Sequence, residues 1–544
     1  MIQIKKDKLD IKCYDTRAQM GAAAGKDISA CIRQLLEEKE YINMIFAAAP
    51  SQNEVLEYLV GDDTICWQRI NAFHMDEYVG IDAGAPQAFS NFLKKAIFDK
   101  VPFRSVNTID CTADPKQEAA RYSELLRNYP TDIVCMGIGE NGHIAFNDPH
   151  VADFNDPEDV KIVSLDDVCR MQQVHDGCFP DIDSVPKYAL TLTVPLLARA
   201  TYRFCVVPAA TKANAVRNTV YGKVGEACPA TVLRITDNST LYCDADSAKS
   251  VFDNEKLKKN TTFRLGVITD EVSADIKEAC EFAAFHNLDC IEIRSVNNRG
   301  PFEYTDDDIT EIKAAAGKHN LAISCISSPL FKCKFDDIEA RKKHVASFEK
   351  LAENASRLGV HLIRGFDFFE AGISLAKRAA AFLPIIDICE KYDITLVIEN
   401  DPSVHSDTPD KVAELVKEIN NPRVLLLYDP GNVLFVSESI KPYPNCYEKS
   451  LPYVAHIHIK DAIFTNPVTA VCIGEGEMDY KGLFTRLVKD GYKGDVILET
   501  HYRKNMELSE EQLVFPGGRG FSQGAYPASE ESIIALKDII LSVI

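Results

Sequence analysis

The chain has no run of 18 apolar residues, and no apolar segment follows its lysine-containing N-terminus. A helix that crosses a bilayer needs about 20 consecutive apolar residues, and a secretory signal needs an apolar core near the start. The 17 cysteines are scattered and include no CxxC pair. We therefore expect a soluble, cytoplasmic protein in which most cysteines are small, reduced core residues.

The sequence has fewer basic than acidic residues, with 60 Lys and Arg residues against 81 Asp and Glu residues, and its formal net charge is −21. The sequence also lacks a block of basic residues. Both features argue against a nucleic-acid or membrane partner, because such partners attract clustered positive charge. A local basic pocket remains compatible with them, so we expect a small-molecule substrate, such as a phosphorylated metabolite.

The 544 residues exceed what one hydrophobic core usually organises, since single cores stop growing at about 250–300 residues. The stretch 246–262 is polar and charged, which makes it the best candidate for a linker. We predict one domain over residues 1–250 and a second over residues 263–544.

Residues 1–245 alternate short apolar runs with helical stretches such as 27–38, 117–126 and 211–221. This alternation predicts an α/β domain with an open, mostly parallel, Rossmann-like sheet. Ligands of such sheets bind beyond the carboxyl ends of the strands. The predicted strands are 43–48, 69–73, 133–137, 189–193, 202–207 and 241–243.

In the second half, strand–helix units follow one another at regular intervals. Helical stretches such as 274–286, 344–358 and 377–392 separate the strands, and a last helix is predicted over 529–541. Eight such units in roughly 250 residues predict a (β/α)8 TIM barrel. The predicted strands are 264–268, 288–293, 322–326, 361–365, 395–398, 424–428, 454–459 and 495–498.

The richest stretch of the first half runs from Met136 to Pro149. It continues a short apolar run, and its glycines predict a tight turn where the backbone can approach a ligand. Asn141, His143 and Asp148 place an amide, an imidazole and a carboxylate on this corner. A lone Gly-rich turn is usually only a turn, but this density of polar, titratable groups favours a functional site.

Three further stretches leave predicted strands in the same half. Ser51 precedes a helix, whose free N–H groups and positive dipole end favour a phosphate. Asp76 and Glu77 are adjacent carboxylates at a strand end, which suits acid–base chemistry about as well as it suits a solvated acidic loop. Lys212 lies in the first turn of a helix, where it either reaches an anion or is only a surface charge.

Together these stretches resemble the glucosamine-6-phosphate deaminase/isomerase family, a relative of the 6-phosphogluconolactonases, over about residues 10–245. The runs 74–80, 139–149 and 185–193 carry the resemblance. It implies a domain without a cofactor that isomerises and deaminates an amino-sugar 6-phosphate such as glucosamine 6-phosphate.

The resemblance also implies roles for individual residues. Asp76 would move a proton between C1 and C2 of the open-chain sugar, and His143, oriented by Asn141 and Asp148, would assist ring opening. The chain departs from the family here, because the best-known members have Asp at the position of Asn141 and usually Glu at that of Asp148. The residues that would hold the 6-phosphate are Ser51, Arg170 and Lys212.

In the second half, four polar side chains end four apolar strands, at intervals of 30, 29 and 41 residues. In a barrel, this spacing places all four on the rim where active sites form. Three carboxylates and one imidazole suit Mn²⁺, Mg²⁺, Co²⁺ or Zn²⁺, although each residue alone would be an ordinary polar strand end. Between the neighbours His456 and His458 we favour His458, which is followed by Ile-Lys-Asp. The predicted metal ligands are Glu399, Asp429, His458 and Glu499.

This half resembles the xylose-isomerase-like sugar phosphate isomerase/epimerase family over about residues 263–543, and the four strand-end residues map onto that family's metal ligands. The resemblance implies that Glu399 and Glu499 act as an acid–base pair on opposite faces of the substrate, while the metal polarises the carbonyl. The family commonly has His three residues after the metal-binding Asp, where this chain has Asn432. The family also contains dehydratases and endonucleases, and the net charge disfavours a nuclease.

A glycine-rich loop, residues 516–524, lies between the eighth predicted strand and the last helix and carries Arg519. Loops at this place in barrels often bind phosphate, so Arg519 is a candidate phosphate ligand, with a flexible surface loop as an equal alternative.

We therefore expect a bifunctional sugar-phosphate enzyme that forms a homo-oligomer. The alternatives are that one domain is inactive and serves as a sugar-phosphate sensor or scaffold, or that the barrel is a dehydratase.

Overall fold

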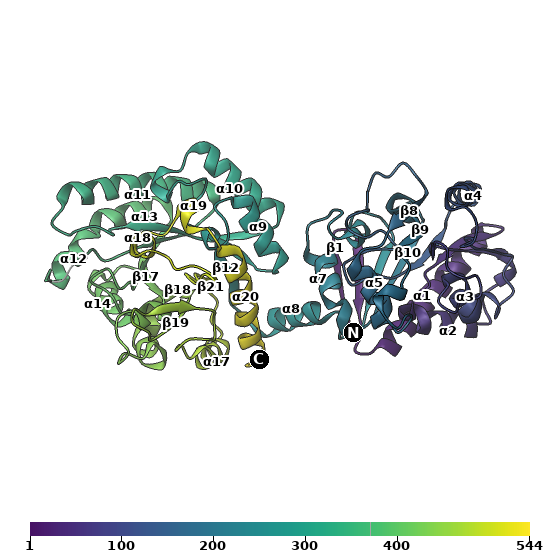
Figure 1. The fold of residues 1–544 in the computed structure, drawn as a ribbon. Helices are drawn as coiled ribbons and strands as arrows, with labels where there is room; N and C mark the ends of the chain where they lie inside the picture. Colours follow the sequence, from purple (N-terminus) through teal and green to yellow (C-terminus); the bar gives the residue numbers. More distant parts are fainter. Residues whose placement is uncertain (370–371) are drawn as a thin grey trace. The chain divides into compact units, whose positions relative to one another are not determined.

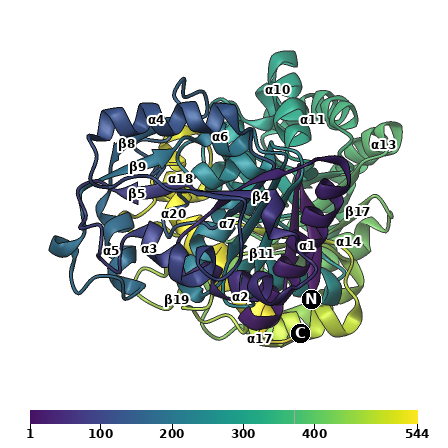
Figure 2. The same ribbon diagram turned by 90° about the vertical axis from the view of Figure 1, so that its right-hand side faces the viewer.

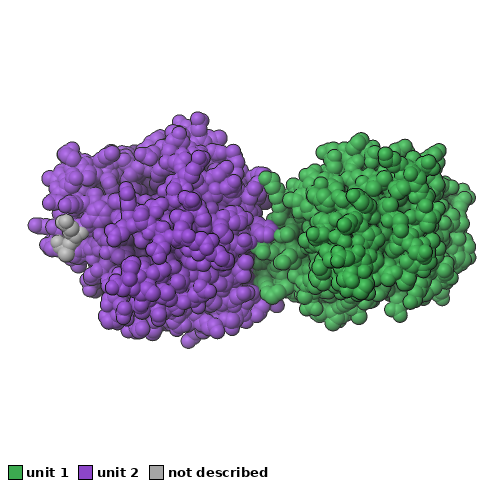
Figure 3. Space-filling view, in the orientation of Figure 1, with its two compact units in different colours: residues 1–254 green, residues 255–544 purple. Residues whose placement is uncertain are grey.

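The computed structural model describes residues 1–369 and 372–544. It divides the chain into two compact units, residues 1–254 and 255–544, each with its own fold (Figures 1 and 3). The predicted fold class, an open and mostly parallel sheet followed by a closed barrel, is confirmed. In the described part of the chain, no helix is long and apolar enough to cross a membrane.

The first unit is built on an eight-stranded sheet whose neighbours are all parallel except the first pair, which forms an antiparallel hairpin. The parallel strands therefore end at one common edge. In spatial order the strands are β1 (Ile2–Lys6), β2 (Leu9–Cys13), β11 (Ser239–Cys243), β10 (Tyr202–Val207), β7 (Ile133–Met136), β3 (Ile42–Phe46), β4 (Ile70–His74) and β6 (Ser105–Asn107).

Helices cover both faces of this sheet, and each face has its own hydrophobic core. Within β3, Met44 and Phe46 belong to one core and Ile45 to the other, because successive side chains of a strand point to opposite faces. Figure 2 shows α1 and α2 together, apart from α4. The first core packs α1 (Arg17–Glu38), α2 (Asn53–Gly61) and α3 (Phe89–Leu93), and the second packs α4 (Pro115–Asn128), α6 (Val194–Ala198) and α7 (Ala213–Tyr221).

A second, antiparallel sheet of the first unit has the order β5 (Asp76–Tyr78), β9 (Tyr188–Leu192), β8 (Val160–Ser164). The prediction that the β9 segment belongs to the mostly parallel sheet is wrong, because an apolar run does not reveal which strand it pairs with. The hairpin of β1 and β2 was not predicted. The helix α5 (Asp167–His175) follows β8.

The second unit contains a closed barrel of eight parallel strands. Such strands are buried on both faces, so they read as continuous apolar runs, which is why all eight were predicted. The strands are β12 (Arg264–Ile268), β13 (Cys290–Ile293), β14 (Ala322–Leu330), β15 (Leu362–Gly365), β16 (Thr395–Glu399), β17 (Val424–Tyr428), β18 (Val454–Ile459) and β21 (Asp495–Leu498).

Helices surround the barrel, and a hairpin of β19 (Asp461–Ile463) and β20 (Thr469–Val471) follows β18. The predicted helix 377–392 is in fact two helices, and Pro384 lies in the first turn of the second, where its missing N–H costs no hydrogen bond. The helices are α9 (Ile276–Phe285), α10 (Asp306–Lys318), α11 (Ile338–Leu358), α12 (Leu375–Ala381), α13 (Leu383–Tyr392), α14 (Pro409–Ile419), α15 (Pro430–Leu434), α16 (Tyr447–Ser450), α17 (Tyr480–Asp490), α18 (Glu510–Val514), α19 (Gly518–Phe521) and α20 (Ala525–Leu541).

The polar stretch 246–262 contains a helix, α8 (Lys249–Asn260), and the division between the units falls inside it. Val251 belongs to a core of the first unit, and Leu257 belongs to the core of the barrel. The predicted linker is therefore helical, and both units use its apolar side chains.

Candidate active sites

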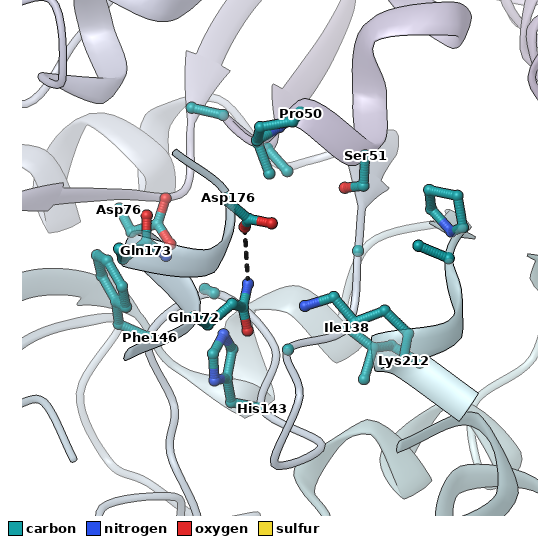
Figure 4. Close-up of a pocket in the computed structure, with 18 of the residues that line it drawn as sticks. Pro50, Ser51, Asp76, Ile138, His143, Phe146, Gln172, Gln173, Asp176 and Lys212 are labelled. Carbon is teal, nitrogen blue, oxygen red and sulfur yellow. Dashed lines mark hydrogen bonds between the residues drawn. The ribbon is translucent and has the colours of Figure 1, made fainter. Parts of the chain in front are cut away.

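A cavity of about 110 Å³ lies at the edge of the first sheet where the parallel strands end. The turns after β2, β3, β4, β7 and β10 all contribute to it, as expected when parallel strands share one carboxyl edge. Figure 4 shows Asp76, His143, Ser51 and Lys212 around this cavity, with Gln172 and Asp176 drawn between Asp76 on the left and Ser51 and Lys212 on the right. The polar side chains on its wall are Arg17, Ser51, Asp76, His143, Gln172, Gln173, Asp176, Thr211 and Lys212.

One part of this wall carries the groups suited to an anion. Lys212 Nζ is buried and has no hydrogen-bond partner among the residues that the structure describes. Burial lowers the pKa of Lys212, although Asp176 and Glu140 oppose the shift. Arg17, at the start of α1, donates from Nε to Glu54 at 2.6 Å and from Nη2 to the Pro50 carbonyl at 2.5 Å, which braces the turn that carries Ser51.

Asp76 and its neighbour Glu77 lie in different environments. Glu77 accepts backbone hydrogen bonds from Tyr78 at 3.0 Å, Phe89 at 3.0 Å and Ser90 at 2.9 Å, so it holds β5 against the start of α3. Asp76 lines the cavity instead. Burial, together with the nearby Glu77 carboxylate, raises the pKa of Asp76 well above its usual value. A carboxylate of raised pKa is a stronger base once it is ionised.

His143 is positioned by a polar network that includes Asp148 and Asn141. Its Nδ1 lies 2.9 Å from Asp148 Oδ1, and Asn141 Nδ2 donates to the same oxygen at 2.9 Å. Burial alone would raise the pKa of Asp148, but the contacts with His143 and Asn141 lower it below its usual value. A Cβ at residue 139 would come within 2.1 Å of the His143 ring, so Gly139 is required for the ring to lie there.

The second cluster lies on the rim of the barrel. Glu399 ends β16, Asp429 follows β17, His458 lies in β18 and Glu499 follows β21. All four side chains are buried, and their ligand atoms lie within 4.8 Å of one another. Three carboxylate oxygens and one imidazole nitrogen at this spacing fit a divalent metal ion.

Basic side chains of the barrel also contact these carboxylates. Lys460 Nζ lies 2.9 Å from Asp429 and 2.9 Å from Glu499, and Arg364 Nη1 lies 3.0 Å from Glu399. Arg294 donates to Glu499 as well. Burial raises the pKa of Asp429 to about 6, although Lys460 opposes the shift. These neighbours balance the negative charge that three buried carboxylates would otherwise concentrate.

Glu292, in β13, distinguishes the two histidines of β18. It accepts from His456 Nε2 at 2.7 Å and lies 3.1 Å from His458 Nε2. His458 Nδ1 then faces Glu499 at 3.1 Å and Glu399 at 3.4 Å. His458 therefore belongs to the four-residue cluster, and His456 lies behind it.

Each half of the chain matches a known protein family. The family described as glucosamine-6-phosphate isomerases/6-phosphogluconolactonase matches residues 15–242. The glucosamine-6-phosphate deaminase of Exiguobacterium sibiricum is 30% identical over 227 residues, which are 41% of this chain and 87% of that protein. The N-terminal half belongs to the glucosamine-6-phosphate deaminase family.

The family described as xylose isomerase-like TIM barrel matches residues 280–519, which lie in the unit with the closed barrel of parallel strands. Among solved structures, a monomeric glucosamine-6-phosphate deaminase is 25% identical with a TM-score of 0.40, covering 44% of this chain and 98% of that one. A xylose isomerase domain protein from Planctomyces limnophilus is 16% identical with a TM-score of 0.40, covering 52% of this chain and 99% of that one.

Two predicted phosphate ligands lie away from these sites. Arg170 of the deaminase domain does not line the cavity: it is buried against Asp167, at 3.2 Å, and donates to the carbonyls of Ile182 and Val185 at 2.5 and 3.3 Å. Arg519 of the barrel is exposed on a groove that also carries Asp275 and Glu278. Both predictions rested on chain position, which does not fix the direction of a long side chain.

The structure also brings in residues that the sequence did not single out. Arg17 follows the hairpin of β1 and β2, whose weak apolar pattern gave no signal for it. Asp176 faces the cavity from just beyond α5. In the barrel, no motif marks Glu292, Arg294, Arg364 or Lys460, because their roles depend on contacts across strands.

Proposed function

We propose that the chain is a bifunctional sugar-phosphate enzyme. The deaminase domain isomerises and deaminates an amino-sugar 6-phosphate, and the barrel is a metal-dependent isomerase or epimerase of the same or a related sugar. The observation that supports the first activity best is the convergence of Ser51, Asp76, His143 and Lys212 on one cavity.

In the deaminase domain, Lys212, Ser51 and Arg17 hold the 6-phosphate of the substrate. A buried ammonium without a partner is costly on its own and gains a charge-assisted hydrogen bond when a phosphate oxygen arrives. Arg17 adds a planar donor group next to the Ser51 turn. The anchored phosphate then fixes which carbon atoms face Asp76 and His143.

His143 assists ring opening, passing a proton from the C1 hydroxyl to the ring oxygen as the C1–O5 bond breaks. Asp148 stabilises the imidazole during this transfer. Asp76 then removes the proton from C2 and returns it to C1, which converts the amino aldehyde to a ketimine. Water hydrolyses the ketimine to a ketose 6-phosphate and ammonia.

Ammonia release from glucosamine 6-phosphate tests this activity, with Asp76→Asn as the control that should abolish it. If no hexosamine phosphate releases ammonia with the wild-type protein, the assignment fails. In that case the alternative is a sensor, and calorimetry with glucosamine 6-phosphate would show binding without turnover.

In the barrel, Glu399, Asp429, His458 and Glu499 would hold a divalent ion such as Mn²⁺, Mg²⁺, Co²⁺ or Zn²⁺. When bound, such an ion polarises a substrate carbonyl and stabilises an enediolate. Glu399 and Glu499 move protons on the two faces of the substrate. Asn432 donates to Glu399 at 3.3 Å, and its Oδ1 accepts from Lys460 at 3.2 Å, so it links the acid–base pair to the basic neighbours.

Metal analysis of the purified protein and of Glu399→Ala tests this second activity. We expect about one divalent ion per chain in the wild type and a large loss in the variant, because one ligand is missing. A protein that carries no divalent metal and gains no isomerase or epimerase activity with any would refute it. We further propose a homo-oligomer that binds small sugar phosphates and neither nucleic acid nor a membrane, which light scattering and a substrate screen would check.

A further inference from the structure

A second cavity, of about 270 Å³, opens at the carboxyl ends of β13, β14 and β15. It lies beside the cluster of Glu399, Asp429, His458 and Glu499. Arg294 follows β13, Lys332 follows β14 and Arg364 lies in β15, and all three line this cavity and are buried. Residues 514–518, from the glycine-rich loop and the end of α18, form another wall. The cavity has about the size of a hexose derivative and adjoins Glu399 and Glu499 through the two arginines.

The charged residues on the wall of this cavity are all basic. Among the described residues that line it, three are basic and none is Asp or Glu. The carboxylates that balance the basic groups lie off the wall: Asp401 is 2.9 Å from Lys332 Nζ, and Glu399 is 3.0 Å from Arg364. A ligand that enters the cavity therefore meets only cations and neutral groups.

Two of these cations are held close together on one aromatic ring. Lys332 Nζ lies 4.5 Å from the centre of the Phe366 ring, and the Arg364 guanidinium lies 4.8 Å from it. Both cations therefore lie near the same ring on the cavity wall, and an anion bound at this wall is attracted by both. Arg364 Nε is buried and has no hydrogen-bond partner in the described residues, so a donor is available.

From these contacts we infer that the barrel takes an anionic sugar derivative, whose phosphate or carboxylate group is bound by Lys332 and Arg364. This inference rests on the proposed isomerase or epimerase activity of the barrel, and it moves the anion subsite from Arg519 to the inner cavity. The anionic end of the substrate lies over β14 and β15, and its reacting carbons lie toward Glu399 and Glu499. A neutral sugar gains no charge-assisted contact with Lys332 or Arg364, so it binds more weakly.

Calorimetric titration of the full-length protein tests the inference. Lys212→Met is introduced first, to weaken the proposed phosphate site of the deaminase domain. The ligands are D-fructose 6-phosphate, D-gluconate and neutral D-fructose, each with Mg²⁺ present. We expect at least one anion to bind about tenfold or more tightly than D-fructose, since a hydrogen bond to a charged group contributes roughly that factor. Binding of phosphate but not gluconate, or the reverse, identifies the anionic group.

Lys332→Met should lower the affinity for that anion by about tenfold or more and leave D-fructose unaffected, and Lys332→Arg should retain most of it. Lys334→Met is the matched control, because Lys334 is exposed, two residues away and off the cavity wall. Equal affinity for D-fructose and the anions, no binding of either anion, or an unchanged affinity in Lys332→Met overturns the inference. Charge-selective binding without turnover would instead refute the proposed activity and leave the anion site standing.

Discussion

Asn141 and Asp148 are joined by a hydrogen bond of 2.9 Å, in which the amide of Asn141 donates to the carboxylate that contacts His143. The same amide nitrogen donates to Asp166 at 2.9 Å. Two carboxylates thus share one NH₂ group, which has a hydrogen for each. The unusual Asn141 is explained by this geometry, because a carboxylate at position 141 would face two others.

We therefore predict that Asn141→Asp, the change toward the better-known family pattern, reduces activity. It should also lower the free energy of unfolding by about 1–3 kcal/mol, since two hydrogen bonds are replaced by repulsion. Thermal unfolding and ammonia release measure the two effects. Asn141→Asp combined with Asp166→Asn should recover much of the stability, and a double variant no better than the single one would contradict this explanation.

A second prediction concerns the stability of Asp76→Asn. The pKa of Asp76 is raised well above its usual value by burial and by Glu77, so the folded protein disfavours the ionised form. The resulting destabilisation is absent below the unfolded pKa of about 3.9 and grows as the pH rises through the raised pKa. The inactive Asp76→Asn variant should therefore melt above the wild type at neutral pH, with the difference shrinking toward pH 4.

Glu77→Gln is the control for this experiment, because burial also raises the pKa of Glu77 but backbone hydrogen bonds oppose that shift. Its carboxylate accepts three backbone N–H groups, and an amide cannot accept all three with its single oxygen. This variant should melt below the wild type at neutral pH. Equal melting temperatures for Asp76→Asn and wild type across the pH range would show that ionised Asp76 does not destabilise the folded protein.

A third prediction compares two arginines of the deaminase domain. Arg17→Met should raise KM for the amino-sugar phosphate by about tenfold or more, with a smaller effect on kcat, because a charge-assisted contact to the phosphate is lost. Arg170→Met should instead lower the melting temperature and leave KM nearly unchanged, since Arg170 bonds to backbone carbonyls away from the cavity. The opposite pattern would indicate that Arg170, and not Arg17, binds the phosphate.

The fourth prediction concerns Glu292, which lies behind the barrel cluster. With His458 Nε2 held by Glu292, Nδ1 is left to face the carboxylates, as a metal-binding histidine requires. Glu292→Gln should weaken Mn²⁺ binding by about 10–100-fold, as is typical when the partner of a ligand histidine is changed. Direct Mn²⁺ titration measures this, and Ser327→Ala, which removes only a hydrogen bond to Glu292, should have a smaller effect.

The elements that were predicted best are those buried on both sides. β17, β18 and β21 have the predicted bounds, because an uninterrupted apolar run marks a barrel strand whatever its neighbours are. The hairpin of β1 and β2 lies at the sheet edge and mixes lysine and aspartate with isoleucine, so its pattern is weak. β9 shows the other limit, because its apolar run is clear and its antiparallel partners are far away in the sequence.

The residues of the candidate sites also divide into those that their place on a strand reveals and those that it does not. Glu399 ends β16, Glu499 directly follows β21 and Asp76 lies two residues after β4, so strand position was enough to single them out. His143 lies farther from β7 and was marked by the density of polar groups around it. Arg294, Arg364 and Lys460 were missed because each is defined by a carboxylate on a different strand. Long side chains such as Arg170 and Arg519 can turn either way from one backbone position, and only the folded surroundings decide.

The helix α8 has a practical consequence for expressing the two units separately. Because Val251 and Leu257 serve different cores, a cut on either side of this helix would deprive one half of an apolar anchor. Truncated proteins should therefore overlap, with residues 1–260 expressed as one fragment and residues 249–544 as the other. The twelve shared residues keep α8 intact in both fragments, with Val251 available to the first core and Leu257 to the second.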